Sequence, residues 1–135
     1  MTAAVEQVAR ALVAQAKTTR QRRALLLRGP AGWTMAAAAA ALEAAGLVDA
    51  LWVGEGPPGA TTVPTGRARE VLGDEVSAAV LDVGAGLDPD ALGAVAGAIR
   101  AGGLLVLRSA GDGGRLARRI ERAAVGAPGV IALGP

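Results

Sequence analysis

The sequence predicts an α/β fold, a Rossmann-like three-layer sandwich with a mostly parallel sheet of about five strands. Short segments that are apolar throughout alternate with segments whose apolar residues recur at helical spacing. Strands that are apolar on both sides are typical of parallel sheets covered by helices on both faces. The 135 residues match the size of one domain and no repeat or linker divides them, so we predict a single domain over residues 1–135.

The order of the elements follows from this alternation. Strands are predicted at residues 24–28, 51–53, 78–83, 104–107 and 130–133. Helices are predicted at residues 5–16, 33–45, 67–72, 89–100 and 115–124. Residues 55–65 are rich in proline and glycine, and we expect them to form the longest loop, without regular structure.

The helix predicted after the third strand has distinctive ends and a distinctive face. Asp88 followed by proline is typical of an N-cap and a first helical turn. Gly93 and Gly97 lie four residues apart, at a cost in helix propensity of about 1 kcal/mol each. We expect this glycine face to let the helix approach the sheet closely. Gly102 and Gly103 are expected to end the helix.

Composition excludes several kinds of chemistry. The sequence has no cysteine and no histidine, which excludes disulfides, zinc sites with the usual ligands, and catalysis by either side chain. No apolar run approaches the roughly 18 to 20 residues that a membrane-spanning helix needs. No secretion signal is apparent, so we expect a cytoplasmic protein without membrane contact.

Charge is divided unevenly along the chain. The formal net charge is +5 over residues 1–28, −6 over residues 29–107 and +3 over residues 108–135. Seven arginines of the two basic ends are candidate contacts for RNA phosphates: Arg20, Arg22, Arg23, Arg115, Arg118, Arg119 and Arg122. The last four recur at helical spacing and would form one basic stripe. The alternative interpretation of these arginines is an ordinary solvated surface.

Two glycine-containing segments resemble nucleotide-binding loops but lack their defining residues. Residues 28–33 follow the first predicted strand, where a phosphate-binding loop would lie. They lack both the Gly-Lys-Ser/Thr ending and the three-glycine dinucleotide pattern, which favours a plain turn. Residues 81–86 resemble the first motif of S-adenosylmethionine-dependent methyltransferases. They follow the third predicted strand, whereas the motif of those enzymes follows their first strand. Those enzymes also place an acid at the end of the strand after the motif, and here that strand ends in Arg108.

The acidic residues near the third strand suggest a metal site only weakly. Asp82 stands at a strand end, where a helicase-type ATPase keeps its magnesium-binding acid, but no phosphate loop accompanies it. Asp82, Asp88 and Asp90 together might be read as carboxylate ligands, yet Asp88 is better explained as a helix cap. We therefore predict no catalytic, cofactor-binding or metal-binding residue in this chain.

Several short segments follow one another in a distinctive order: residues 23–29 with Trp33, 51–54, 71–73, 80–82, 86–97 and 100–107. Read together, they resemble the amino-terminal domain of bacterial tRNA(Met) cytidine acetyltransferases (the TmcA family). Within them, the positions that match the family pattern most distinctively are Asp82, Asp88, Gly93, Gly97, Gly102 and Gly103. The resemblance extends over nearly the whole chain, from about Arg23 to Ser109.

The resemblance implies an accessory role. Members of the family acetylate N4 of the wobble cytidine in elongator methionine tRNA, and they continue into helicase-like, acetyltransferase and tRNA-binding modules. Because the chain stops at Pro135, none of the catalytic residues of those modules can be carried over to it. We expect a non-catalytic domain that docks on helicase and acetyltransferase modules and contacts tRNA. The alternatives are a reduced methyltransferase-like domain that binds S-adenosylmethionine and a pure protein–protein assembly module.

Overall fold

The computed structural model describes residues 2–71, 75–83, 89–110, 114–124 and 129–135. Its strands are β1 (Arg23–Arg28), β2 (Leu51–Val53), β3 (Thr61–Val63), β4 (Val76–Asp82), β5 (Ile99–Ser109) and β6 (Val130–Leu133). Its helices are α1 (Ala3–Thr19), α2 (Ala31–Ala44), the 3₁₀ helix η1 (Thr65–Val71), α3 (Pro89–Ala98) and α4 (Gly114–Ala124). No helix within these ranges is both long and apolar enough to cross a membrane.

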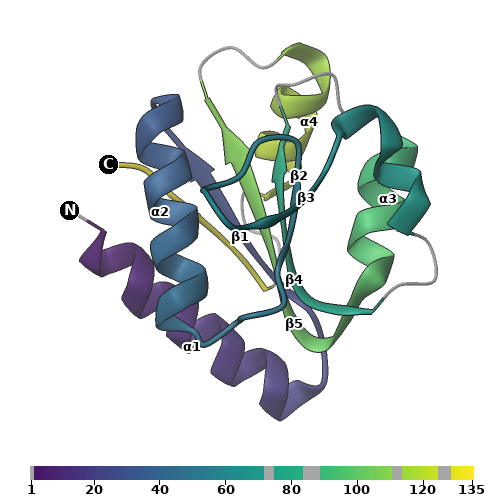
Figure 1. Cartoon of the computed structure of the whole chain (residues 1–135). Coiled ribbons are helices and arrows are strands. Elements are labelled where there is room, and N and C mark those ends of the chain that lie inside the picture. Colours follow the sequence, from purple (N-terminus) through teal and green to yellow (C-terminus); the bar gives the residue numbers. More distant parts are fainter. Residues whose placement is uncertain (1, 72–74, 84–88, 111–113, 125–128) are drawn as a thin grey trace.

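The strands form one six-stranded sheet in the order β3-β2-β4-β5-β1-β6, and all paired strands run parallel. Helices α1 and α2 pack on one face, while α3 and η1 lie on the other (Figure 1). The predicted three-layer α/β sandwich is therefore confirmed. All carboxyl ends of the strands lie at one edge of the sheet and all amino ends at the other, which we call the carboxyl edge and the amino edge.

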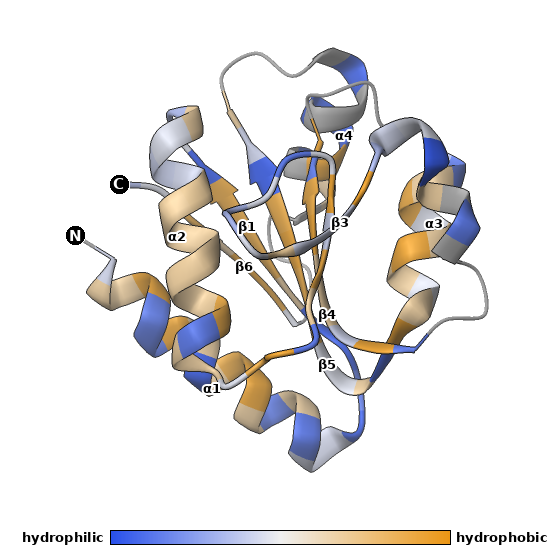
Figure 2. Cartoon of the chain, in the orientation of Figure 1, coloured by the Kyte–Doolittle hydropathy of each residue, from blue (hydrophilic) through white to orange (hydrophobic). Residues whose placement is uncertain are grey.

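Alternate residues of each central strand serve the two faces. Leu25 and Leu27 of β1 pack with α1 and α2, whereas Leu26 belongs to the core beneath α3. Strand β5 divides in the same way, with Val106 on the first face and Leu107 on the second. This alternation explains why the strands are apolar throughout, and Figure 2 shows the hydrophobic strands enclosed between helices.

The helices on the first face bury different kinds of surface. Helix α1 is amphipathic and buries five residues spaced along one face: Val5, Ala9, Leu12, Val13 and Ala16. It ends at Arg20, which adopts the left-handed conformation (φ 55°) while its backbone N–H bonds the Ala16 carbonyl. Helix α2 is mostly alanine, and its small side chains allow it to pack against both α1 and the sheet.

The structure differs from the sequence prediction at one edge of the sheet. The segment 55–65, predicted to lack regular structure, contains β3, which pairs with β2 as the outermost strand. The prediction missed it because β3 is only three residues long and mostly exposed, so it has no apolar run. Pro64 follows it directly, and proline is compatible with the end of an edge strand.

The helix predicted to reach Arg100 ends earlier. Helix α3 stops at Ala98, and β5 begins at Ile99 and includes Gly102 and Gly103, which had been expected to end the helix. Tertiary pairing overrides the local pattern here because Ile99 pairs with Val76 of β4. Gly103 lies so close to β4 that an added Cβ would stand 2.5 Å from the Ser77 carbonyl oxygen.

The glycine face of α3 was also interpreted wrongly. Gly93 and Gly97 are exposed, and a Cβ added at either would meet nothing within 4 Å. The sheet is contacted instead by buried residues such as Ala91, Ala94 and Val95. The predicted cap residue Asp88 lies outside the described residues.

These glycines give a direct stability test. Replacing Gly93 or Gly97 with alanine should raise the free energy of unfolding by about 0.5–1 kcal/mol each, because helix propensity improves and no atom is displaced. Gly103→Ala is the contrasting variant and should destabilise the protein, since its Cβ would collide with backbone. Urea unfolding followed by circular dichroism measures all three. A loss of stability in Gly93→Ala and Gly97→Ala would contradict their exposed placement.

Candidate functional site

The carboxyl edge between β1 and β5 is where an open α/β sheet would bind a ligand. The chain leaves β1 for α2 on the first face, and it leaves β5 for α4, whose Ile120 packs into the core of the second face. Neighbouring strands whose connections leave toward opposite faces create the crevice in which such folds bind nucleotides. The residues that line this position therefore decide whether a ligand could enter it.

The protein's own side chains fill this crevice. Arg108, only 4% exposed, donates through Nε to the Thr34 hydroxyl (3.3 Å) and through Nη2 to the Ala31 carbonyl (3.3 Å). Its guanidinium thus occupies the amino end of α2, where a phosphate would otherwise bind. Gly29 donates its N–H to the Ser109 carbonyl (3.1 Å), which joins the ends of β1 and β5.

The turn after β1 is tightly packed as well. A Cβ added at Gly29 would stand 2.9 Å from Pro135 and 3.1 Å from Trp33. Helix α2 begins at Ala31, directly after this turn. Residues 28–33 therefore have the geometry of the plain turn that their sequence favours, with no open phosphate loop.

The acidic candidates at the same edge are only partly described. Asp82 is half-buried at the end of β4, in register with Arg108 of β5. Residues 84–88, which carry the methyltransferase-like glycines and Asp88, lie outside the described residues. Asp90 is exposed in the first turn of α3. Among the residues that the structure describes, no group of three acidic side chains could hold a metal ion.

The candidate RNA-binding arginines fall into two groups with different surroundings. Arg22 donates through Nε to the Ile99 carbonyl (2.6 Å), and Arg23 donates to Gln21, Arg22 and Thr19. Both therefore help to fix the start of β1 at the amino edge. Arg20 is exposed at the end of α1.

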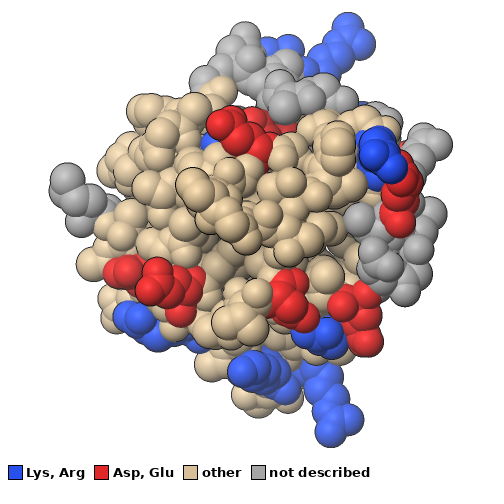
Figure 3. All heavy atoms as spheres, viewed as in Figure 1, with Lys and Arg blue, Asp and Glu red and all other residues tan. Residues whose placement is uncertain are grey.

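The second group lies on α4, where Arg115, Arg118, Arg119 and Arg122 are all exposed. Helix α4 is confirmed close to its predicted bounds. Figure 3 shows lysine and arginine side chains at the top, at the upper right and along the bottom of the view, with acidic side chains near each group and a wide surface of other residues between them. The basic residues therefore form separate patches on this face.

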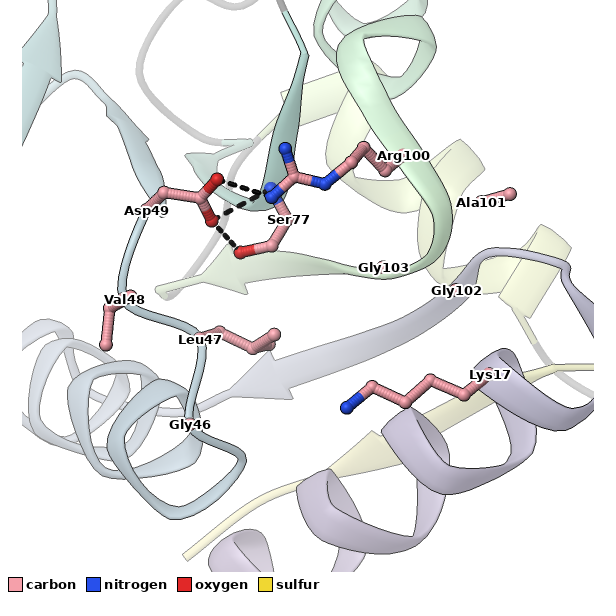
Figure 4. A pocket seen from close by; sticks show the side chains of 10 residues that line it. All are labelled: Lys17, Gly46, Leu47, Val48, Asp49, Ser77, Arg100, Ala101, Gly102 and Gly103. Carbon is pink, nitrogen blue, oxygen red and sulfur yellow. Dashed lines mark hydrogen bonds and ion pairs between the residues drawn. The ribbon is translucent and has the colours of Figure 1, made fainter.

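A cavity at the amino edge brings together residues that the sequence did not single out as a site. It has a volume of about 430 Å³ and is lined by Lys17, Gly46, Leu47, Val48, Asp49, Ser77, Arg100, Ala101, Gly102 and Gly103 (Figure 4). We call it the amino-edge cavity. Its walls come from the end of α1, the turn after α2, and the starts of β4 and β5.

Three polar residues on one side of this cavity form a network that we call the Asp49 clamp. Asp49 Oδ1 accepts hydrogen bonds from the Ser77 backbone N–H (3.1 Å) and the Ser77 hydroxyl, and Oδ2 forms an ion pair with Arg100 Nη2 (2.5 Å). The Ser77 hydroxyl, with Arg100 as a further donor, holds the pKa of Asp49 below its ordinary value. The clamp joins the segments that lead into three neighbouring strands, β2, β4 and β5.

The sequence carried only a diffuse signal for this site. Its polar side chains, Lys17, Asp49, Ser77 and Arg100, stand at the end of a helix or beside the starts of strands, and successive ones are 32, 28 and 23 residues apart. Because amino ends of parallel strands meet at one edge, polar residues at strand starts could have been grouped. Arg100 was assigned to a helix, which removed it from that group.

The Asp49 clamp predicts a pH-dependent contribution to stability. The pKa of Asp49 is lower in the folded protein than its ordinary value of about 4. The ionised carboxylate therefore contributes its full stabilisation of the fold at pH values above about 4. It is lost as the pH falls through the lower, folded-state pKa. The Asp49 and Arg100 side chains are 44% and 41% exposed, so solvent screening limits the effect to about 1 kcal/mol or less.

Urea unfolding of the native protein and Asp49→Asn between about pH 2.5 and 7 tests this. We expect a stability difference that is constant above about pH 5 and shrinks as the solution becomes more acidic. Glu43→Gln, on the exposed side of α2, is the control for removal of one carboxylate. A difference for Asp49→Asn that stays the same down to pH 2.5 would contradict the lowered pKa.

Comparison with known proteins places the chain in a family. Residues 1–110 match the family described as tRNA(Met) cytidine acetyltransferase TmcA, N-terminal. Proteins named tRNA(Met) cytidine acetyltransferase TmcA are 40% identical over 104 residues in Nitrosococcus halophilus and 38% over 103 residues in Haloarcula marismortui. The relative from Yersinia pestis is 41% identical over 88 residues.

These alignments cover most of this chain and little of its relatives. They include 76%, 74% and 64% of the chain, but only 14%, 13% and 12% of the respective relatives. The family match contains every residue of the amino-edge cavity and ends before α4. The chain therefore belongs to the family of the N-terminal domain of tRNA(Met) cytidine acetyltransferase TmcA.

Proposed function

We propose that this chain is a non-catalytic accessory domain of a tRNA(Met) cytidine acetyltransferase system. The observation that carries the proposal is the family match over residues 1–110, together with relatives whose names specify this activity. The chain spans about 14% of the length of the Nitrosococcus relative, so most of that protein lies outside the aligned region. In this proposal, acetyl transfer is carried out by those other parts.

The chemistry of the described residues supports an accessory role. The crevice that would bind a nucleotide in this fold holds Arg108, and Trp33 and Pro135 pack closely against Gly29 in the turn beside it. The sequence contains neither histidine nor cysteine, which leaves it without the side chain used most often as a general base. In this proposal the chain acts by docking on the helicase and acetyltransferase modules.

We assign tRNA contact chiefly to the exposed arginines. The α4 stripe presents Arg115, Arg118, Arg119 and Arg122 over about two helical turns, a spacing that suits successive phosphates of an RNA backbone. Arg20 adds an exposed cation at the amino edge. Arg22 and Arg23 contribute less to this contact because their guanidinium groups bond the protein itself.

Fluorescence anisotropy with labelled tRNA(Met) tests the RNA contact. Arg119→Ala with Arg122→Ala should weaken binding about tenfold. It should also lower the steepness of the plot of log K against log salt by about 1.5, the share of two phosphate contacts. The control is Arg10→Ala with Arg67→Ala, which removes the same charge from exposed positions outside α4. Equal losses in both double variants, or no loss in either, would contradict recognition by the stripe.

Docking is tested separately by a pull-down with the helicase and acetyltransferase modules of a relative. The proposal predicts that the chain retains these modules after RNase treatment. Retention of the modules without any measurable tRNA affinity would reduce the function to protein assembly alone. A rise in melting temperature with S-adenosylmethionine would instead support a methyltransferase-like domain and contradict the proposal.

A further inference from the structure

The amino-edge cavity is large enough for a ligand and has two chemically different sides. Its volume of about 430 Å³ falls within the range of small-molecule sites. The Asp49 clamp lies on one side, and Lys17 extends along the other toward the turn of Gly46 and Leu47 (Figure 4). Leu47 and Val48 add apolar surface. Val48 is 97% exposed, so the fold itself does not use this side chain.

The charge available to a ligand in this cavity is positive. Asp49 is neutralised by Arg100, and both of its oxygens are engaged by protein donors. Lys17 forms no ion pair within the described parts of the chain. A ligand would therefore meet one ammonium group that forms no ion pair with the described residues, beside a carboxylate that is already paired.

The wider amino edge carries charges of both signs. Five basic residues gather there: Lys17, Arg20, Arg22, Arg23 and Arg100. Among the described residues, three carboxylates oppose them: Asp49, Glu75, and Glu43 in the last turn of α2. The carboxyl ends of α1, α2 and α3 also reach this edge, each equivalent to about half a negative charge. These opposing terms nearly balance the five cations, so the attraction for an anion is local and comes from the ammonium group of Lys17.

The backbone around the cavity is fixed by close packing. Gly102 has a φ of +88° and passes within van der Waals distance of Lys17, since a Cβ added there would stand 3.6 Å from the Lys17 Cα. Gly103 packs against Ser77 and has no room for a side chain. These contacts hold the end of α1 against the start of β5, and the cavity forms between them and the turn after α2.

We propose that the amino-edge cavity binds one phosphate-bearing nucleotide unit. Lys17 supplies the charge for the phosphate, and Leu47 and Val48 supply apolar surface for the sugar and base. The phosphate source is either a phosphodiester of the tRNA, which rests on the proposed function, or a free nucleotide. All residues of this site lie within the family match, unlike the α4 stripe.

The test is an NMR titration of the ¹⁵N-labelled chain with three probes: inorganic phosphate, AMP and tRNA(Met). We expect AMP to shift the amides of Gly46, Ser77 and Gly102 in a saturable way. Lys17→Met, which keeps most of the stem but removes the charge, should weaken AMP binding about tenfold. Arg10→Met is the matched control, since it removes one exposed cation from the same helix outside the cavity.

A second variant separates the two sides of the site. Val48→Ser alters a fully exposed side chain, so the fold should be preserved. It should weaken AMP binding several-fold and leave the response to inorganic phosphate unchanged. Circular dichroism confirms that each variant is folded before its affinity is compared.

The outcomes also distinguish the phosphate sources. Saturable binding of AMP that Lys17→Met weakens, with tRNA unaffected, supports a free nucleotide. A Lys17-dependent loss of tRNA binding, with shifts at the same amides, supports a phosphodiester. Absence of cavity shifts with both AMP and tRNA, or equal losses in Lys17→Met and Arg10→Met, would overturn the proposal. That result would leave binding through the α4 stripe, and hence the proposed function, intact.

Discussion

The parallel pairing of β5 between β1 and β4 is the constraint on which the rest of the structure depends. Val106 of β5 pairs with Leu25 of β1 on one side and with Val80 of β4 on the other. A slip of one residue would turn each inward side chain of β5 to the opposite face. The same strand carries Arg100 at the amino edge and Arg108 at the carboxyl edge, so its register places both.

The two edges of the sheet consequently have different chemistry. At the carboxyl edge, Arg108 is buried and occupies the position in which this fold class usually holds an anion. At the amino edge, Arg100 is partly exposed and pairs with Asp49, which leaves Lys17 as the cation facing open space. The usual ligand crevice is filled by Arg108, and a cavity remains open at the opposite edge of the same sheet.

The local sequence predicted the strands that consist of buried apolar runs. It missed the segments whose structure depends on pairing with a neighbouring strand. Residues 24–28 and 51–53 were recognised as strands because their apolar character needs cover on both faces. Strand β3 is short and exposed, so only its pairing with β2 reveals it. Residues 99 and 100 were assigned to a helix and Gly102 and Gly103 to its end. The place of these residues in β5 depends on contact with β4, more than 20 residues earlier.

For the candidate sites too, features written in a short segment were predictable, and features made by distant segments were not. The absence of a phosphate-loop pattern in residues 28–33 was visible in the sequence, whereas the guanidinium of Arg108 that fills the crevice was not. The amino-edge cavity joins Lys17, Asp49, Ser77 and Arg100 from four distant segments, and no local pattern links them. The family resemblance was recognisable because several short segments occur in a fixed order, and the match over residues 1–110 confirms it.

The measurement that tests the central claim most directly is acetylation of tRNA(Met) by a chimaera. Residues 1–110 of this chain would replace the corresponding segment of the Nitrosococcus halophilus relative, and acetylcytidine would be quantified by mass spectrometry after digestion of the tRNA. An accessory domain predicts that the chimaera acetylates tRNA and that the isolated 135-residue chain does not. Acetylation by the isolated chain, or a folded chimaera without activity, would contradict the assignment.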